Sequence, residues 1–264
     1  MTETVIQFDS DGTPTLGTLR LPKGGPAPVV LLLHGFTGTR DEMPVAGTTE
    51  GVFSRTARLL AGAGLASLRI DFRHDARSPE AFTGMTFDGQ IADARAALAW
   101  LRADPRLDGS RVAVLGWSQG GLIAASVAGL EPALKAAVLW AAVALPRQSF
   151  GALLVRCEAG IPSEGLALID TPHLRLGPAF FDGVRRHDPL TDIARYSGPL
   201  LVAHGWQDSA VLPEAAGHYI AAHGGRHELW MADMDHGFNA GTNAVTLDRM
   251  VDVTAGFLAG ALRA

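Results

Sequence analysis

Ser118 lies in the segment GWSQG (residues 116–120), which has the pattern G-x-S-x-G. An apolar run over 111–116 precedes it, and a helix-like run rich in small residues follows over 119–129. A sharp turn between a strand and a helix lifts a serine hydroxyl above the edge of a sheet, and a helix amino terminus favours negative charge. Ser118 is therefore the candidate nucleophile for an acyl-transfer reaction.

A serine hydroxyl is a poor nucleophile until a base removes its proton, and His236 is the best candidate for that base. It lies in MADMDHGFN, directly after the apolar run 227–232, so we expect it in the loop that leaves the last strand. His218 and His223 have a spacing that does not put them on one helix face for a metal. For an isolated histidine, a surface or structural role is the usual interpretation. The position of His236 at a strand end argues for a chemical role.

The base needs a carboxylate to fix its tautomer and stabilise the imidazolium. Asp208 follows the apolar run 199–205 in HGWQDSAV, again at the end of a predicted strand. Asp235 and Asp233 are the rival acids, but neighbouring residues of a chain rarely point together. We therefore predict Asp208 as the acid and a loop hydrogen-bonding role for Asp235.

An oxyanion that develops during acyl transfer needs fixed hydrogen-bond donors. The backbone N–H of Gln119 lies next to the nucleophile, and the backbone N–H of Phe36 lies in the loop after VVLLLHG. Taken alone, HGF is an ordinary strand-to-loop turn. Together with the order Ser118, Asp208, His236, it predicts that Phe36 and Gln119 supply the two donors.

The elements that would position these residues alternate along the chain. A hairpin with a turn at Asp11-Gly12 opens the sequence. Strands separated by helices imply a mostly parallel sheet with helices on both faces, an α/β fold in a single domain over 1–264. On the helix 86–103, Asp93, Arg95 and Arg102 are expected to face outward. Strands are predicted over 27–35, 65–72, 111–116, 134–143, 199–205 and 227–232, and helices over 51–63, 86–103, 119–129, 213–223 and 243–262.

Residues 144–190 interrupt this alternation with five prolines and no clear strand. A long irregular stretch within a compact domain is typically a lid or an insertion, so we expect a small cap over the carboxyl edge of the sheet. Its apolar residues, among them Leu154 and Leu166, could line an acyl pocket or form the cap's own core. The predicted pocket residues are Trp117, Phe150, Leu153, Phe180 and Phe181.

Composition excludes several classes of protein. The net charge of −5 gives no polybasic signal, so neither nucleic acid nor a membrane surface is expected as a partner. Cys157 is the single cysteine, which excludes an intramolecular disulfide and suggests an inert thiol. The amino terminus does not read as a signal peptide, and the apolar runs are far shorter than the roughly 20 residues of a membrane span. We expect a cytoplasmic protein.

Six segments together resemble a serine α/β-hydrolase, most closely the small bacterial carboxylesterases of the feruloyl or cinnamoyl esterase type: LLLHGFTGTRDE, LRIDFRHDARS, MTFDGQIADARAALAWLRAD, GWSQGG, HGWQDSAV and DHGF. The resemblance spans about residues 25–260 except the cap, and it implies the same nucleophile, acid, base and oxyanion donors. In one departure, His74-Asp75-Ala76-Arg77-Ser78 stands where these esterases carry Gly-His-Gly-x-Ser. GWSQGG and HGWQD also resemble the catalytic domain of prolyl-oligopeptidase-like peptidases.

The expected function is hydrolysis of short to medium acyl or arylalkyl esters through an acyl-enzyme. Peptidase or amidase action is one alternative, and a ligand-sensing hydrolase fold without turnover is another. We expect a small-molecule ester as the binding partner and neither a cofactor nor a metal. The sequence is also compatible with association into a homodimer.

Overall fold

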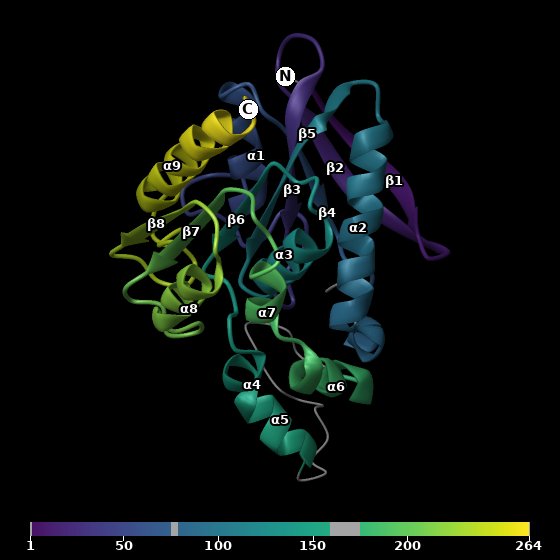
Figure 1. The fold of residues 1–264 in the computed structure, drawn as a ribbon, viewed down its shortest axis with the longest axis vertical. Helices are drawn as coiled ribbons and strands as arrows, with labels where there is room; N and C mark the ends of the chain where they lie inside the picture. Colours follow the sequence, from purple (N-terminus) through teal and green to yellow (C-terminus); the bar gives the residue numbers. More distant parts are fainter. Residues whose placement is uncertain (1, 75–78, 159–174, 264) are drawn as a thin grey trace.

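The computed structural model describes residues 2–74, 79–158 and 175–263. Its centre is an eight-stranded sheet with the strand order β1-β2-β4-β3-β5-β6-β7-β8 (Figure 1). The strands are β1 (Thr2–Ser10), β2 (Thr13–Leu21), β3 (Ala27–Leu33), β4 (Ala66–Ile70), β5 (Leu107–Trp117), β6 (Ala136–Trp140), β7 (Leu200–Gly205) and β8 (His227–Ala232).

Strands β3 to β8 pair in parallel, whereas the hairpin β1–β2 joins β4 in antiparallel orientation. All seven residues of β3 except Pro28 are buried, and so is every residue of β4 and β6. Burial on both faces is typical of central parallel strands between helix layers. The predicted α/β-hydrolase fold is confirmed.

Two helix layers cover the sheet and create two hydrophobic cores. Helices α1 (Val52–Gly62) and α9 (Val245–Ala261) pack on one face. Helices α2 (Phe87–Ala103), α3 (Gln119–Leu130), α7 (Pro189–Ile193) and α8 (Glu214–Ala222) pack on the other. No helix within the described ranges has the length and apolar character that crossing a membrane would require.

The chain between β6 and β7 contributes α4 (Pro146–Ser149), α5 (Gly151–Glu158) and α6 (Pro178–Arg186) before α7. These three helices lie together beyond one end of the sheet (Figure 1), whereas α7 packs on α3. A short 3-10 helix, Pro79–Gly84, precedes α2. Leu166 and residues 75–78 lie outside the described residues, so the extent of the cap stays a prediction.

Asp93 corrects the sequence-based expectation for α2. We expected its side chain to face solvent, but it is fully buried and binds Arg73, which follows β4. The carboxylate accepts hydrogen bonds from the Arg73 Nε at 2.6 Å and from the Arg73 backbone N–H at 2.8 Å. A buried carboxylate is tolerated where an arginine pairs with it, and this pair ties α2 to the end of β4.

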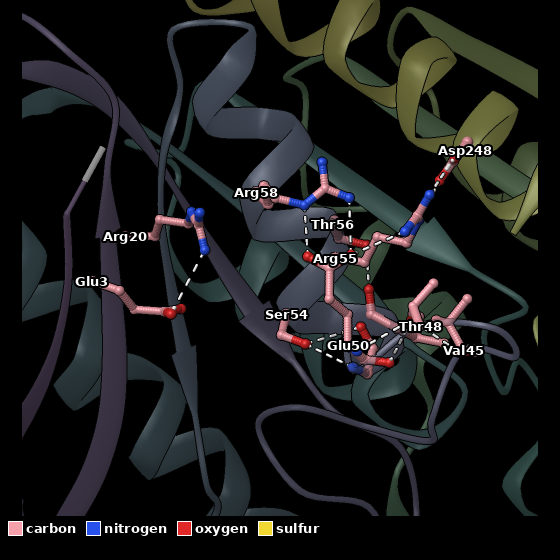
Figure 2. A network of polar contacts seen from close by, with 12 residues as sticks. Glu3, Arg20, Val45, Thr48, Glu50, Ser54, Arg55, Thr56, Arg58 and Asp248 are labelled. Atoms are coloured by element: carbon pink, nitrogen blue, oxygen red, sulfur yellow. Dashed lines mark hydrogen bonds and ion pairs between the residues drawn. The ribbon is translucent and has the colours of Figure 1, made fainter.

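A polar network anchors α1 and the loop that precedes it (Figure 2). The Arg55 guanidinium binds Asp248 of α9 at 2.6 Å and Glu50 at 2.9 Å, and Arg58 binds Glu50 at 2.6 Å. Hydrogen bonding and charge from Arg58 and Arg55 hold the Glu50 pKa below its usual value, although partial burial opposes this. The network therefore fixes one end of the long β3–α1 loop, whose other end lies at the candidate site.

Candidate active site

Ser118 stands between β5 and α3 with φ 57° and ψ −118°. Such a backbone conformation costs a non-glycine residue on the order of 1–3 kcal/mol and persists only where its surroundings hold it. Here the Ser118 N–H donates to the Trp140 carbonyl at 3.0 Å, and the Val143 N–H donates to the Ser118 carbonyl at 3.0 Å. The segment after β6 therefore holds the serine in its strained turn.

Glycines allow this turn because backbone approaches them closely. A Cβ at Gly116 would overlap the Gly120 carbonyl, and one at Gly120 would overlap the carbonyls of Leu33 and His34. Gly35, in the loop after β3, approaches the other side of the serine, since a Cβ there would lie 3.3 Å from the Ser118 Cβ. The strained turn at Ser118, here called the elbow, is thus in direct contact with the loop after β3, here called the β3 loop.

Gly120→Ala is therefore expected to destabilise the fold by about 3 kcal/mol, the upper end of the usual cost of overpacking, because rigid backbone oxygens occupy the space of the new methyl group. The matched control is Gly217→Ala on α8, where a Cβ meets no atom within 4 Å. Urea unfolding of the two variants measures the difference. Equal stability of Gly120→Ala and wild type would show that the elbow is not packed this tightly.

His236 and Asp208 meet across the carboxyl end of the sheet. The His236 Nδ1 lies 2.7 Å from the Asp208 Oδ2, with the histidine in the loop after β8 and the aspartate in the loop after β7. The His236 ring is 5.7 Å, centroid to centroid, from the ring of Trp117, the residue before Ser118. The structure therefore brings the predicted acid and base together beside the elbow.

Asp208 is held as a carboxylate. Its side chain is fully buried, yet the Ala210 and Val211 N–H groups each donate to its Oδ1 at 2.9 Å. Burial alone would raise the Asp208 pKa, but hydrogen bonds from His204 and His236 and the charge of His236 outweigh it and lower the pKa well below its usual value. Because the ionised carboxylate accepts the proton on Nδ1, the lone pair of the neutral His236 ring lies on its other nitrogen, Nε2, which points away from Asp208.

Asp235, the rival acid, is exposed and pairs with Asn239. Its Oδ1 accepts the Asn239 N–H at 2.8 Å, and its own N–H donates to the Asn239 Oδ1 at 3.0 Å. This reciprocal pair closes the loop that carries His236. The loop role predicted for Asp235 agrees with these contacts.

The loop after β3 carries Phe36 and is fixed by His34. The His34 Nε2 accepts the Phe72 N–H at 3.1 Å, so its Nδ1 carries the proton and donates to the Gly35 carbonyl at 2.8 Å. Gln119 is the first residue of α3, where a backbone N–H has no partner within the helix. The predicted donor residue Gln119 thus directly follows Ser118, and Phe36 directly follows Gly35, which contacts Ser118.

The five predicted pocket residues do not form one group. Phe150, Leu153, Phe180 and Phe181 belong to the core on the α2–α3 face, whereas Trp117 belongs to the core on the α1–α9 face. Phe150 and Phe180 both contact Phe36, with ring centroids 5.4 and 5.6 Å away. These buried aromatic side chains join the cap helices to the β3 loop, and their role in binding substrate stays a prediction.

A cavity of about 580 Å³ is lined by the residues that follow Asp208, although Ser118, Asp208 and His236 are not among its lining residues. Its walls come from the segment after β6, including Leu145 and Gln148, and from the segment after β7, including Ser209 and Leu212. The volume lies within the usual range of small-molecule sites. Sequence reasoning missed this cavity because segments far apart in the chain, including parts of α4 and α8, form it.

Two polar residues at the site were also missed from the sequence. His204, at the end of β7, has its Nε2 3.2 Å from the Asp208 Oδ2 and 2.9 Å from the Val211 carbonyl. Glu42 lies in the loop after β3 and accepts the Gly35 N–H. A polar residue near the carboxyl end of a buried parallel strand, such as His204, was a usable signal. Over the described ranges, no group of three His, Cys, Asp or Glu side chains could hold a metal ion.

The fold and site define a serine hydrolase of the α/β-hydrolase class. The model for the prolyl oligopeptidase family (Peptidase_S9) matches residues 52–262, and the chain belongs to this family.

Known structures share the fold over nearly the whole chain. Est1E from Butyrivibrio proteoclasticus, solved with bound ferulic acid, has a TM-score of 0.79 and 21% identity, covering 98% of this chain and 100% of that one. The Pyrococcus horikoshii acylaminoacyl peptidase has a TM-score of 0.76 and 16% identity, covering 98% of this chain and 41% of that one. Identities this low show the fold alone.

Among curated proteins, the non-reducing polyketide synthase ausA of Penicillium brasilianum is 31% identical over 150 residues, half of this chain. The match covers 5% of that synthase. The chain therefore corresponds to a small part of the curated relatives that it matches.

Proposed function

We propose that the protein is a carboxylesterase that cleaves short to medium acyl or arylalkyl esters, with Ser118 as nucleophile, His236 as base and Asp208 as acid. The observation that carries this proposal is the 2.7 Å contact between His236 and a buried carboxylate beside a serine in a strained elbow. A nucleophile, a base and an oriented third group are the minimum for acyl transfer by serine.

The reaction proceeds in two steps. His236 takes the Ser118 proton as Oγ attacks the acyl carbon, and the negative charge on the carbonyl oxygen is held by the Phe36 and Gln119 N–H groups. The C–O bond to the alcohol breaks, and His236 returns the proton to the departing oxygen. Water then attacks the acyl-enzyme in the same way, releasing the carboxylic acid and free Ser118.

The cavity lined by the residues that follow Asp208 supports a small substrate. Its walls are mixed, with Leu145 and Leu212 as apolar residues and Gln148 and Ser209 as polar ones. A volume of about 580 Å³ accommodates a short acyl chain or one aromatic ring rather than a polymer. We assign this cavity to the acyl or alcohol group of the ester.

Family membership and the acylaminoacyl peptidase fold favour one alternative, cleavage of amides. A matched pair, ethyl ferulate and N-ethylferulamide, separates the two because only the leaving group differs. We expect measurable kcat/KM on the ester and no detectable cleavage of the amide. Comparable rates on both substrates would favour the peptidase or amidase function, and binding without turnover would favour a ligand sensor.

A further inference from the structure

Glu42 lies in the loop between β3 and α1, and its carboxyl group reaches back to Gly35 near the start of that loop. Its Oε1 accepts the Gly35 N–H at 2.5 Å, and its own N–H donates to the Thr39 carbonyl at 3.0 Å. The backbone of Glu42 is left-handed, with φ 61°, which turns the side chain back toward the start of the loop. The carboxyl group thus closes the loop across seven residues.

The surrounding glycines leave room for this carboxyl group. A Cβ at Gly38 would lie 2.8 Å from both carboxyl oxygens of Glu42. A Cβ at Gly35 would lie 3.5 Å from the Glu42 Oε1 and 3.3 Å from the Ser118 Cβ. The same glycine therefore separates the carboxyl group from the nucleophile.

Two hydrogen bonds fix the peptide unit that carries the Phe36 N–H, and a third fixes the peptide unit before it. The Gly35 carbonyl accepts from the His34 Nδ1 at 2.8 Å and from the Gly38 N–H at 3.1 Å, while Glu42 holds the Gly35 N–H. Hydrogen bonds to both the N–H and the carbonyl of Gly35 restrict rotation of the backbone about its Cα. The direction of the Phe36 N–H is then set before substrate binds.

The charged groups around Glu42 have other partners. On its own loop, Arg40 binds Asp71, which follows β4, and Asp41 lies 3.1 Å from Arg69 of β4. From the β8–α9 loop, His236 binds Asp208 and Asp235 binds Asn239. Directly after β3, the neutral His34 ring donates to the Gly35 carbonyl. Within the described ranges, Glu42 forms no ion pair, so a negative charge on its carboxyl group would have no cation to compensate it.

Burial raises the pKa of Glu42 to about 8, and the Gly35 and Met43 N–H groups oppose the rise only in part. A pKa in this range favours the neutral form of the half-buried Glu42 carboxyl group near pH 7. Ionisation above pH 8 would put a negative charge close to the place where the oxyanion forms, which disfavours that oxyanion.

We propose that Glu42 is a positioning residue whose carboxyl group, acting through the N–H and Cα of Gly35, aims the Phe36 N–H at the oxyanion formed on Ser118. This inference rests on the proposed esterase function. It adds a residue that touches neither substrate nor the nucleophile's hydroxyl. Glutamine at this position keeps a neutral acceptor for the Gly35 N–H, whereas alanine removes it.

The test measures kcat and KM on p-nitrophenyl butyrate for wild type, Glu42→Ala and Glu42→Gln from about pH 6 to about pH 9.5. We expect Glu42→Ala to lose about 10- to 100-fold in kcat with little change in KM, below the loss for a deleted oxyanion donor. Glu42→Gln should keep most of the activity at pH 7 and lack the fall in kcat that wild type shows above about pH 8. Glu228→Gln on exposed β8 is the matched surface control.

Three results would overturn the proposal: wild-type kcat in Glu42→Ala, equal losses in both variants, or the same alkaline fall in Glu42→Gln. If Glu42→Ala does not fold, the dependence of kcat on pH in Glu42→Gln still tests the proposal. The rate at which a fluorophosphonate labels Ser118 distinguishes this proposal from the esterase function, because labelling needs no ester turnover. Absence of labelling in wild type contradicts the function, whereas equal rates in wild type and Glu42→Ala contradict only the role of Glu42.

Thermal unfolding gives an independent readout. The folded-state pKa of Glu42 lies above its ordinary value of 4.5, so its neutral form stabilises the fold fully below pH 4.5, and this contribution is lost as pH rises through about 8. The Tm of wild type relative to Glu42→Gln should therefore fall between pH 4.5 and pH 8. A constant difference would show that Glu42 is ionised in the folded protein throughout this range.

Discussion

Ser118→Ala is expected to reduce kcat on p-nitrophenyl butyrate by about 10⁴- to 10⁶-fold, the loss typical of a missing serine nucleophile. The hydroxyl sits on an elbow whose strain only nearby hydrogen bonds, such as that to the Trp140 carbonyl, can hold. Alanine keeps the backbone and removes the attacking oxygen alone. The expected variant is folded, with a Tm close to wild type.

Ser126→Ala provides the matched control for that result. Ser126 lies on the same α3 helix and is buried, but its hydroxyl finds no partner among the described residues. Its loss should leave kcat unchanged within about threefold. Full activity of Ser118→Ala would instead refute the acyl-enzyme mechanism.

Asp208→Asn is expected to lower kcat by about 10⁴-fold, as replacing the acid does in serine proteases. The Asp208 carboxylate fixes the His236 tautomer through a 2.7 Å contact and stabilises the imidazolium by its charge. An asparagine amide is neutral and can present its NH₂ to Nδ1, which reverses the required tautomer. The loss should be in kcat rather than in KM, measured on the same ester.

Asp235→Asn decides between the two candidate acids. Asp235 is exposed and bonds to Asn239, so its substitution should change kcat by less than about threefold. A loss at Asp235 as large as the loss at Asp208 would contradict the assignment. Comparing both variants under identical conditions removes any general effect of charge.

Much of the fold was predictable because the strands are buried on both faces. Runs such as VVLLL in β3 and AAVLW in β6 are continuous and apolar, and helix-length segments separate them. The positions of Ser118, Asp208 and His236 follow from a related logic, since each comes at or shortly after the end of a predicted strand, although β8 itself is largely exposed. Parallel strands bring their carboxyl ends to one edge, so Ser118, Asp208 and His236 are expected at the same edge of the sheet.

Contacts between distant loops could not be predicted in this way. Asp93 looks like a solvent-facing helix residue until its partner Arg73, twenty residues earlier, is placed beside it. Glu42 likewise has its role through a backbone N–H seven residues away, which no periodicity reveals. The cavity next to the segment after Asp208 depends on α4, α8 and the loops beside them, which follow different strands.

The most direct test of the central claim is to label the protein with a fluorophosphonate and map the modified peptide by mass spectrometry. The account predicts one phosphonate per chain, on Ser118, with labelling abolished in Ser118→Ala and strongly slowed in Asp208→Asn. Labelling of another residue, or ester hydrolysis that persists after Ser118 is fully modified, would contradict it.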